Sequence, residues 1–161
     1  TQPKLVVLDE PVSALDVSVQ AQVLNLLREL QDELGTSYLL ITHDLGTVRF
    51  VADEVAVMYL GQVVERAGSG DLLDRPHHPY TQALFAAELP NHPSQRREVE
   101  PIRGEMPSPL DPPSGCRFRT RCPHVVAVCE SEPAAHPVGS GHVAACHLRS
   151  VTDVGVQDAA H

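Results

Sequence analysis

The sequence predicts an α/β fold with parallel strands, and three patterns in its first third support this class. Residues 5–8 form an uninterrupted apolar run, which is typical of a strand buried on both faces. Apolar side chains then recur at helical spacing from Val19 to Leu34, and residues 37–42 form a second strand-like run. A strand, a helix and a strand at this spacing make a βαβ unit, whose two strands are parallel.

The ends of the first helix carry recognisable signals. Asp16 or Ser18 can cap its start, because their side chains accept hydrogen bonds from the first free backbone N–H groups. Gly35 stands where helices commonly end with a left-handed residue. A second helix is expected around residues 46–51.

The pattern weakens after these elements. Residues 55–60 and 62–65 predict a β-hairpin that closes the edge of the sheet. Short helices are expected at residues 69–74 and 79–87, the second opened by a proline after a polar turn. Residues 90–115 are rich in proline and serine, which predicts an extended linker.

Proline content suggests the domain organisation. Twelve of the fourteen prolines follow Arg66, so we expect a compact domain over residues 1–68, a loop-rich extension over 69–150 and a loose tail over 151–161. The chain starts without an initiator Met and enters a buried-type strand almost at once. Since such a strand needs neighbours to cover it, we expect the chain to be part of a longer protein.

Charge and hydropathy exclude two classes of partner. The net charge is −9, which gives no electrostatic footprint for nucleic acid. No apolar run approaches the roughly 20 residues that cross a bilayer, and the sequence shows no secretory signal. Any link to a membrane is therefore expected through a partner protein.

Two carboxylates, Asp9 and Glu10, directly follow the first strand. Ligands of open α/β sheets bind beyond the carboxyl ends of the strands. Adjacent strand residues point to opposite faces, so the two acids should have different tasks. In a nucleotide site, Asp9 can hold Mg²⁺ while Glu10 orients or deprotonates the water that attacks the γ-phosphate. Taken alone, an acidic turn after a buried strand explains these residues equally well.

The residues that follow favour the nucleotide site. The tetrapeptide SALD occupies residues 13–16, and ITHD at residues 41–44 ends the next strand. This order resembles the Walker B strand, D-loop and switch histidine of the ABC ATPase family. The resemblance implies that the first domain is the C-terminal part of a P-loop ABC nucleotide-binding domain.

The same resemblance implies roles for five residues. Glu10 would be the catalytic glutamate, Asp9 a Mg²⁺ ligand and His43 a contact of the γ-phosphate of ATP. Ser13 and Asp16 would lie in the loop that crosses the interface between two nucleotide-binding domains and borders the bound ATP. The alternatives are a plain helix cap for Asp16 and, for His43, a strand-end histidine bonded to a backbone carbonyl.

The rest of the chain indicates a branch of this family. HHPYTQAL at residues 77–84 resembles a segment of the oligopeptide/dipeptide importer ATPases, and residues 107–123 and 141–147 resemble their C-terminal extension. Residues 10–22 look closest to the second of the two ATPase subunits that these importers usually carry. The residues themselves suggest no catalytic role for the HHPY segment.

This branch implies an energy-coupling subunit that hydrolyses ATP, with Mg²⁺, at the cytoplasmic face of a bacterial plasma membrane. Its partners would be a second ABC ATPase subunit, identical or not, the transmembrane permease subunits and, indirectly, an extracytoplasmic peptide-binding protein. Peptides are the default solute, although related importers carry nickel or sugars. An ABC ATPase of DNA repair is disfavoured by the acidic charge, the HPY segment and the cysteine-containing tail.

Half of the family's ATP site is missing from the sequence. The 161 residues contain neither a GxxxxGKS/T phosphate loop nor an LSGGQ-like signature. In the family, both motifs precede the Walker B strand. Without the phosphate-binding N–H groups and lysine, the two acids have no anchored substrate. We therefore predict that this chain alone neither binds MgATP tightly nor hydrolyses it. The alternative function is a non-catalytic remnant that acts as a metal-binding or interaction module.

Four cysteines, separated by five, six and sixteen residues, lie in the extension: Cys116, Cys122, Cys129 and Cys146. Four thiolates suit a 4Fe-4S iron–sulfur cluster or a structural Zn²⁺, although the short CxxC spacing of zinc ribbons is absent. The family resemblance implies a 4Fe-4S cluster. His142 or His147 could replace one thiolate. The alternative is four reduced thiols that pack a small satellite core.

Overall fold

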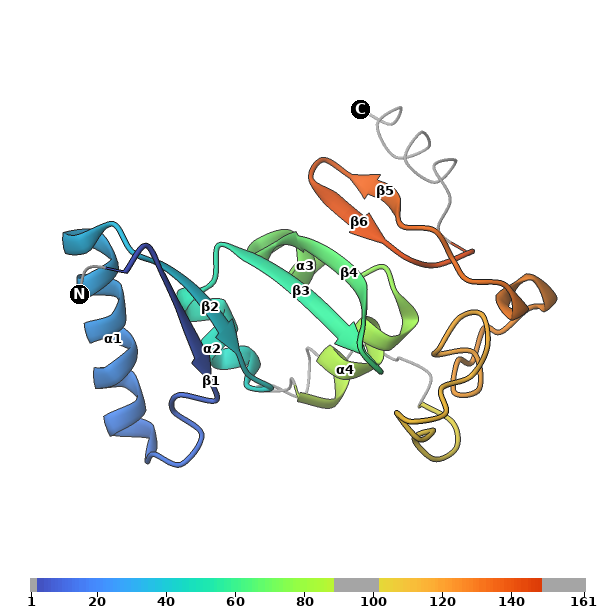
Figure 1. The fold of residues 1–161 in the computed structure, drawn as a ribbon, viewed down its shortest axis with the longest axis horizontal. Helices are drawn as coiled ribbons and strands as arrows, with labels where there is room; N and C mark the ends of the chain where they lie inside the picture. Colours follow the sequence, from blue (N-terminus) through green and yellow to red (C-terminus); the bar gives the residue numbers. More distant parts are fainter. Residues whose placement is uncertain (1–2, 89–101, 149–161) are drawn as a thin grey trace. The chain divides into compact units, whose positions relative to one another are not determined.

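A computed structural model describes residues 3–88 and 102–148, which form two compact units, Thr1–Asp53 and Glu54–His161 (Figure 1). Both units contain strands and helices, as the predicted α/β class requires. The units divide after residue 53, whereas the sequence suggested a boundary after residue 68. The predicted tail over 151–161 lies outside the described residues, as does part of the predicted linker over 90–115.

The first unit is a βαβ unit followed by a short helix. Its elements are β1 (Leu5–Asp9), α1 (Val17–Leu34), β2 (Ser37–Ile41) and α2 (Leu45–Val51). The two strands are parallel, with Leu5 opposite Ser37 and Asp9 opposite Ile41. The predicted strand–helix–strand unit and the helix after it are confirmed.

Both ends of α1 follow from local chemistry. The Asp16 carboxylate accepts hydrogen bonds from the backbone N–H groups of Ser18 and Val19, at 3.1 and 3.0 Å. At the other end Gly35 adopts a left-handed conformation, with φ of 62°, and donates its N–H to the carbonyl of Gln31. The predicted cap and the predicted terminal glycine are both confirmed.

The expectation that both faces of these strands are buried is wrong for the described residues. Leu5 and Val7 of β1 are 56% and 57% exposed, and Leu39 and Ile41 of β2 are about as exposed. Exposure alternates along both strands because successive side chains point to opposite faces. This sheet has two strands within residues 3–88 and 102–148, and one of its faces carries an exposed apolar stripe.

The second unit contains a four-stranded antiparallel sheet in the order β3-β4-β6-β5. Its elements are β3 (Glu54–Tyr59), β4 (Gln62–Gly68), α3 (Ser69–Asp74), α4 (Pro79–Glu88), a short 3₁₀ helix (Ala127–Glu130), β5 (His136–Gly139) and β6 (His142–Ala144). The predicted hairpin is confirmed as β3 and β4, and the two predicted short helices as α3 and α4.

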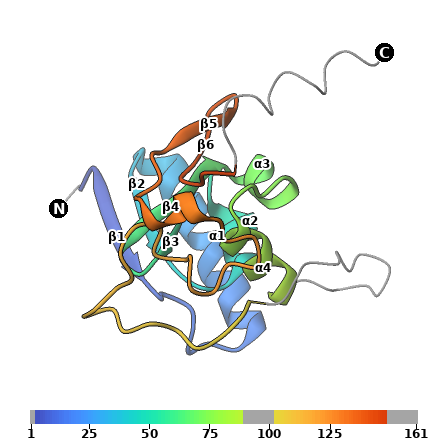
Figure 2. The same ribbon diagram turned by 90° about the vertical axis from the view of Figure 1, so that its right-hand side faces the viewer.

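The hairpin does not close the edge of the first sheet, so that expectation is wrong. The second edge of β4 pairs with β6 from the C-terminal hairpin, whose ribbon is seen in Figure 2. In this pairing Glu65 lies opposite Ala144. A strand edge must satisfy its backbone hydrogen-bonding groups, and β4 does so with a strand from the distant extension. The hairpin and the extension therefore belong to one unit.

An aromatic cluster forms much of the core of this unit. Phe118 is 1% exposed, and its ring lies 5.3 Å from that of Tyr59 and 5.5 Å from that of Tyr80. The rings of Tyr59 and Tyr80 are 4.7 Å apart. The cluster thus fixes the loop around residue 118 against β3 and the start of α4.

Candidate functional site

The strand ends of the first unit bring Glu10 and His43 together. Glu10 leaves β1 with a φ of 48°, unusual for a residue with a side chain, while its N–H donates to the carbonyl of Ile41 at 2.9 Å. Its Oε1 lies 2.7 Å from Nδ1 of His43, so the two side chains form an ion pair when the imidazole is protonated. Backbone strain of this kind costs about 1–3 kcal/mol and gathers at functional sites.

The other predicted acid, Asp9, lies one residue earlier. It is the last residue of β1, is exposed and stands opposite Ile41 in the parallel register. Since Mg²⁺ is usually held by one or two carboxylates together with phosphate oxygens and waters, the donor type at Asp9 suits this ion.

Ser13 and Asp16 lie in the exposed loop between Glu10 and α1. The Ser13 hydroxyl donates to the carbonyl of Glu10 at 3.1 Å, which folds the loop back on the strand end. The Asp16 carboxylate caps α1 and also accepts from the Ser18 hydroxyl at 2.6 Å. These hydrogen bonds, chiefly the one from the Ser18 hydroxyl, lower the pKa of Asp16. The capping alternative for Asp16 is thus realised, and a second contact of this exposed residue stays a prediction.

Two residues of this region were missed by the sequence reasoning. Asp44 caps α2 by accepting from the backbone N–H groups of Gly46 and Thr47, and its pKa is lowered, chiefly by the Thr47 hydroxyl. The side chain of Gln20, on α1, donates to Asp44 Oδ2 at 2.8 Å. An aspartate directly before a helix is a capping signal that the sequence did contain.

The strand-end group has the chemistry of an acid–base site open to solvent. The side chains of His43 and Glu10 are 79% and 37% exposed, so water and a ligand can reach both. A carboxylate can orient or deprotonate water, and a neighbouring imidazole can stabilise negative charge on a ligand oxygen. Both lie at the carboxyl ends of parallel strands, where α/β sheets bind ligands.

The cysteines do not assemble a metal site among the described residues, where no group of three or more His, Cys, Asp or Glu side chains could hold an ion. The structure records all four cysteines as thiols. Burial raises the pKa of Cys116 and of Cys122, and the neighbouring Cys129 adds to both shifts. Protonated, partly buried thiols behave as small apolar side chains. The predicted cluster or zinc site is not supported by the described residues.

The two histidines considered as replacement ligands have other hydrogen-bond partners. His147 Nε2 lies 3.0 Å from the carbonyl of Ser131, and His142 Nε2 lies 2.7 Å from Oε1 of Glu65. Nearby, Gly115 has a φ of 69°, and a Cβ there would lie 2.6 Å from the carbonyl oxygen of Cys129. Glycine permits this close approach of two backbones, and the Cys116 N–H donates to the Cys129 carbonyl beside it at 3.0 Å.

A buried carboxyl group anchors the HHPY segment, for which the residues alone suggested no catalytic role. Glu65 is 1% exposed, and its two oxygens accept the backbone N–H groups of His77 and His78 at 2.6 and 2.9 Å. The third partner is the imidazole of His142, on β6. His78 Nδ1 in turn accepts the N–H of Tyr80 in the first turn of α4. Burial lowers the pKa of His78 to about 4, against a smaller opposing effect of Glu65.

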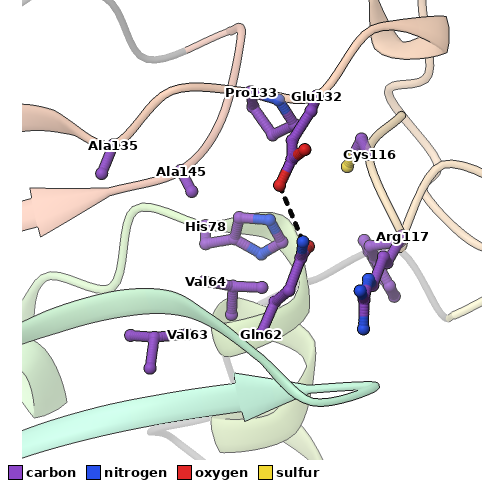
Figure 3. A pocket seen from close by; sticks show the side chains of 11 residues that line it. Gln62, Val63, Val64, His78, Cys116, Arg117, Glu132, Pro133, Ala135 and Ala145 are labelled. Carbon is purple, nitrogen blue, oxygen red and sulfur yellow. Dashed lines mark hydrogen bonds between the residues drawn. The ribbon is translucent and has the colours of Figure 1, made fainter. Parts of the chain in front are cut away.

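A small cavity of about 200 Å³ lies beside His78 (Figure 3). Its polar lining includes His78 and Arg117, and the Gln62 amide donates to the Glu132 carboxylate at 2.8 Å. The volume is below the roughly 300 Å³ at which ligand pockets begin. Asp9 and Glu10 are not among its lining residues, so this cavity does not belong to the candidate site at the strand ends.

Comparison with known proteins confirms the predicted family resemblance. Residues 64–129 match the family described as the oligopeptide/dipeptide transporter, C-terminal region. Over 146 residues the chain is 52% identical to a putative peptide import ATP-binding protein of Brucella ovis, covering 90% of this chain and 46% of that protein. Over 152 residues it is 49% identical to the oligopeptide transport ATP-binding protein AppF of Bacillus subtilis, covering 92% of this chain and 46% of that protein. The chain thus spans somewhat less than half the length of these relatives.

Proposed function

Since this chain is a relative of the ATP-binding proteins of peptide importers, we propose that it forms the C-terminal part of an energy-coupling ATPase subunit. The complete subunit hydrolyses MgATP to drive import of oligopeptides or dipeptides. No helix among residues 3–88 and 102–148 is long and apolar enough to span a bilayer. As an ATPase subunit of an importer, the protein would lie beside permease subunits at the cytoplasmic face of the membrane.

The observation that carries the proposal is the 2.7 Å contact between Glu10 and His43 at the ends of two parallel strands. Glu10 would accept a proton from the attacking water, and His43 would donate a hydrogen bond to an oxygen of the γ-phosphate. Asp9 would hold Mg²⁺, which when bound neutralises the charge that develops on the phosphate oxygens. The residues of this chain then orient the water and stabilise the transferring group.

The loop from Ser13 to Asp16 would face a second ATPase subunit. All four of its residues are exposed, as a loop that meets a partner in the assembled dimer requires. A dimer of such subunits would border each ATP from two sides and transmit closure to the permease. The chain by itself, which contains no phosphate loop, is predicted to neither bind MgATP tightly nor hydrolyse it.

Peptide uptake by a chimera tests the proposal. This chain would replace the matching C-terminal portion of the Bacillus subtilis relative, in cells that lack that relative. Labelled-peptide uptake should be restored, and Glu10→Gln should abolish it because the neutral amide cannot take the proton of water. Glu33→Gln, which alters an exposed acid on α1, is the matched control and should leave uptake unchanged. A chimera that accumulates normally, joins the membrane complex and imports nothing would contradict the proposal.

A further inference from the structure

Gln20 links the candidate site to α1 through two hydrogen bonds. It lies in the first turns of the helix, and its side chain is half-buried. Nε2 donates to Asp44 Oδ2 at 2.8 Å and to Thr47 Oγ1 at 3.0 Å. Because an amide nitrogen carries two hydrogens, both side-chain donors of Gln20 are used in bonds to the segment that follows β2.

The receiving residue, Asp44, fixes the turn that carries His43. Its carboxylate accepts from Gln20, from the Gly46 N–H at 2.9 Å and from the Thr47 hydroxyl at 2.6 Å. Its own N–H donates to the Thr42 hydroxyl at 3.1 Å. His43 stands between Thr42 and Asp44, so hydrogen bonds on both sides set its backbone position.

The other end of this connection is the loop that precedes α1. The backbone N–H of Gln20 donates to the carbonyl of Asp16 at 2.8 Å, and Asp16 ends the exposed loop that starts at Ser13. A single residue therefore contacts the end of that loop with its backbone and the His43 turn with its side chain.

We propose that Gln20 is a positioning residue that holds the His43 turn in register with the start of α1, so that His43 meets Glu10. The catalytic meaning of this role rests on the proposed function, whereas the hydrogen bonds do not. The side-chain amide of Gln20 donates to Asp44 and Thr47, so Gln20 acts on the His43 turn through Asp44.

Three substitutions at Gln20 separate hydrogen bonding from packing. Gln20→Leu keeps the approximate volume and removes the donors. Gln20→Glu sets a carboxylate against the Asp44 carboxylate, whereas Gln20→Lys restores a donor toward it. Gln22→Leu, at an exposed position of the same helix, is the matched control for adding an apolar side chain.

NMR on the complete 161-residue chain without nucleotide tests the positioning role directly. Gln20→Leu and Gln20→Glu should remove the cross-relaxation between the His43 ring and the Glu10 side chain. They should also speed amide exchange at Gly46 and Thr47 by about tenfold, the equivalent of one hydrogen bond. Gln20→Lys and Gln22→Leu should preserve both signals. Unchanged signals in Gln20→Leu, with α1 still folded, would overturn the proposal, as would the same losses in Gln22→Leu.

The chimera separates this proposal from the proposed function. Gln20→Leu should lower kcat for ATP about tenfold and leave KM unchanged, because the amide contacts neither the nucleotide nor the base. An active chimera whose kcat is unaffected by Gln20→Leu would overturn the catalytic part of the proposal. An inactive chimera would instead count against the proposed function, and the NMR result would still decide the positioning role.

Discussion

Replacing Glu65 by alanine should lower the free energy of unfolding of the second unit by about 3–5 kcal/mol. The change removes the carboxylate that accepts the N–H groups of His77 and His78 and that pairs with the imidazole of His142. Buried donors left without partners are costly, since they lose their bonds to water as well. Because the Glu65 side chain is almost completely buried, its removal also leaves a cavity in the interior of the unit.

Urea denaturation of the complete chain, followed by tyrosine fluorescence, would measure this effect, because two of the three tyrosines belong to the second unit. Glu65→Gln should cost less than Glu65→Ala, since one carbonyl acceptor remains. The control is Glu54→Ala on the neighbouring strand, whose exposed ion pair with Arg66 should contribute less than about 1 kcal/mol. Equal, small effects of Glu65→Ala and Glu54→Ala would show that the hydrogen bonds of Glu65 do not stabilise this unit.

Acidification from pH 7 to pH 4 should remove about 3 kcal/mol of stability through His78 alone. Burial lowers the pKa of His78 from 6.5 to about 4 in the folded chain. Between these two values the unfolded chain binds a proton that the folded chain rejects. The stabilisation is therefore complete above pH 6.5 and is lost as the pH falls toward 4.

His78→Asn isolates this contribution, since the asparagine oxygen can still accept the N–H of Tyr80 but does not titrate. The free energy of unfolding would be measured for both proteins at several pH values. The two curves should converge below pH 6.5, because only the wild type loses the histidine contribution, while carboxylates titrate alike in both. Curves that stay parallel down to pH 4 would mean that His78 is not held neutral by burial.

The first unit could be predicted well from the sequence because its signals are local. The helix from residue 17 to 34 is set by apolar periodicity together with the Asp16 cap and Gly35. The two apolar runs flanking it define a parallel pair, and that pair brings Glu10 and His43 to the same edge. The prediction that both faces of the strands are buried was wrong for the described residues, because such burial depends on neighbours beyond these two strands.

The second unit was predicted less well because its organising contacts join distant residues. The Glu65 carboxyl meets a histidine 77 residues later, and no local pattern marks either partner. Strands β5 and β6 have only four and three residues, too few to show an alternation. Because β6 pairs with β4, the hairpin of β3 and β4 belongs to the sheet of the second unit and not, as the sequence had suggested, to the first sheet.

Within the candidate site, some residues could likewise be picked out from local sequence order, whereas others depend on a distant partner. Residue types in a fixed order singled out Glu10, His43 and the loop up to Asp16 as candidates. Gln20 was missed because a glutamine on a helix surface carries no signal until its partner Asp44 is placed beside it. The cysteine spacing suggested a metal, whereas no group of three or more His, Cys, Asp or Glu side chains among the described residues could hold an ion.

MgATP turnover by the purified chimera, with and without Glu10→Gln, would show whether Glu10 and His43 form the hydrolytic site. We expect turnover by the chimera, none by this chain alone, and a decrease of at least about a hundredfold when Glu10 loses its ability to accept a proton. Glu33→Gln should stay within about twofold of the unmodified chimera. Turnover that survives Glu10→Gln unchanged would contradict the assignment of the Glu10 and His43 pair as the site of ATP hydrolysis.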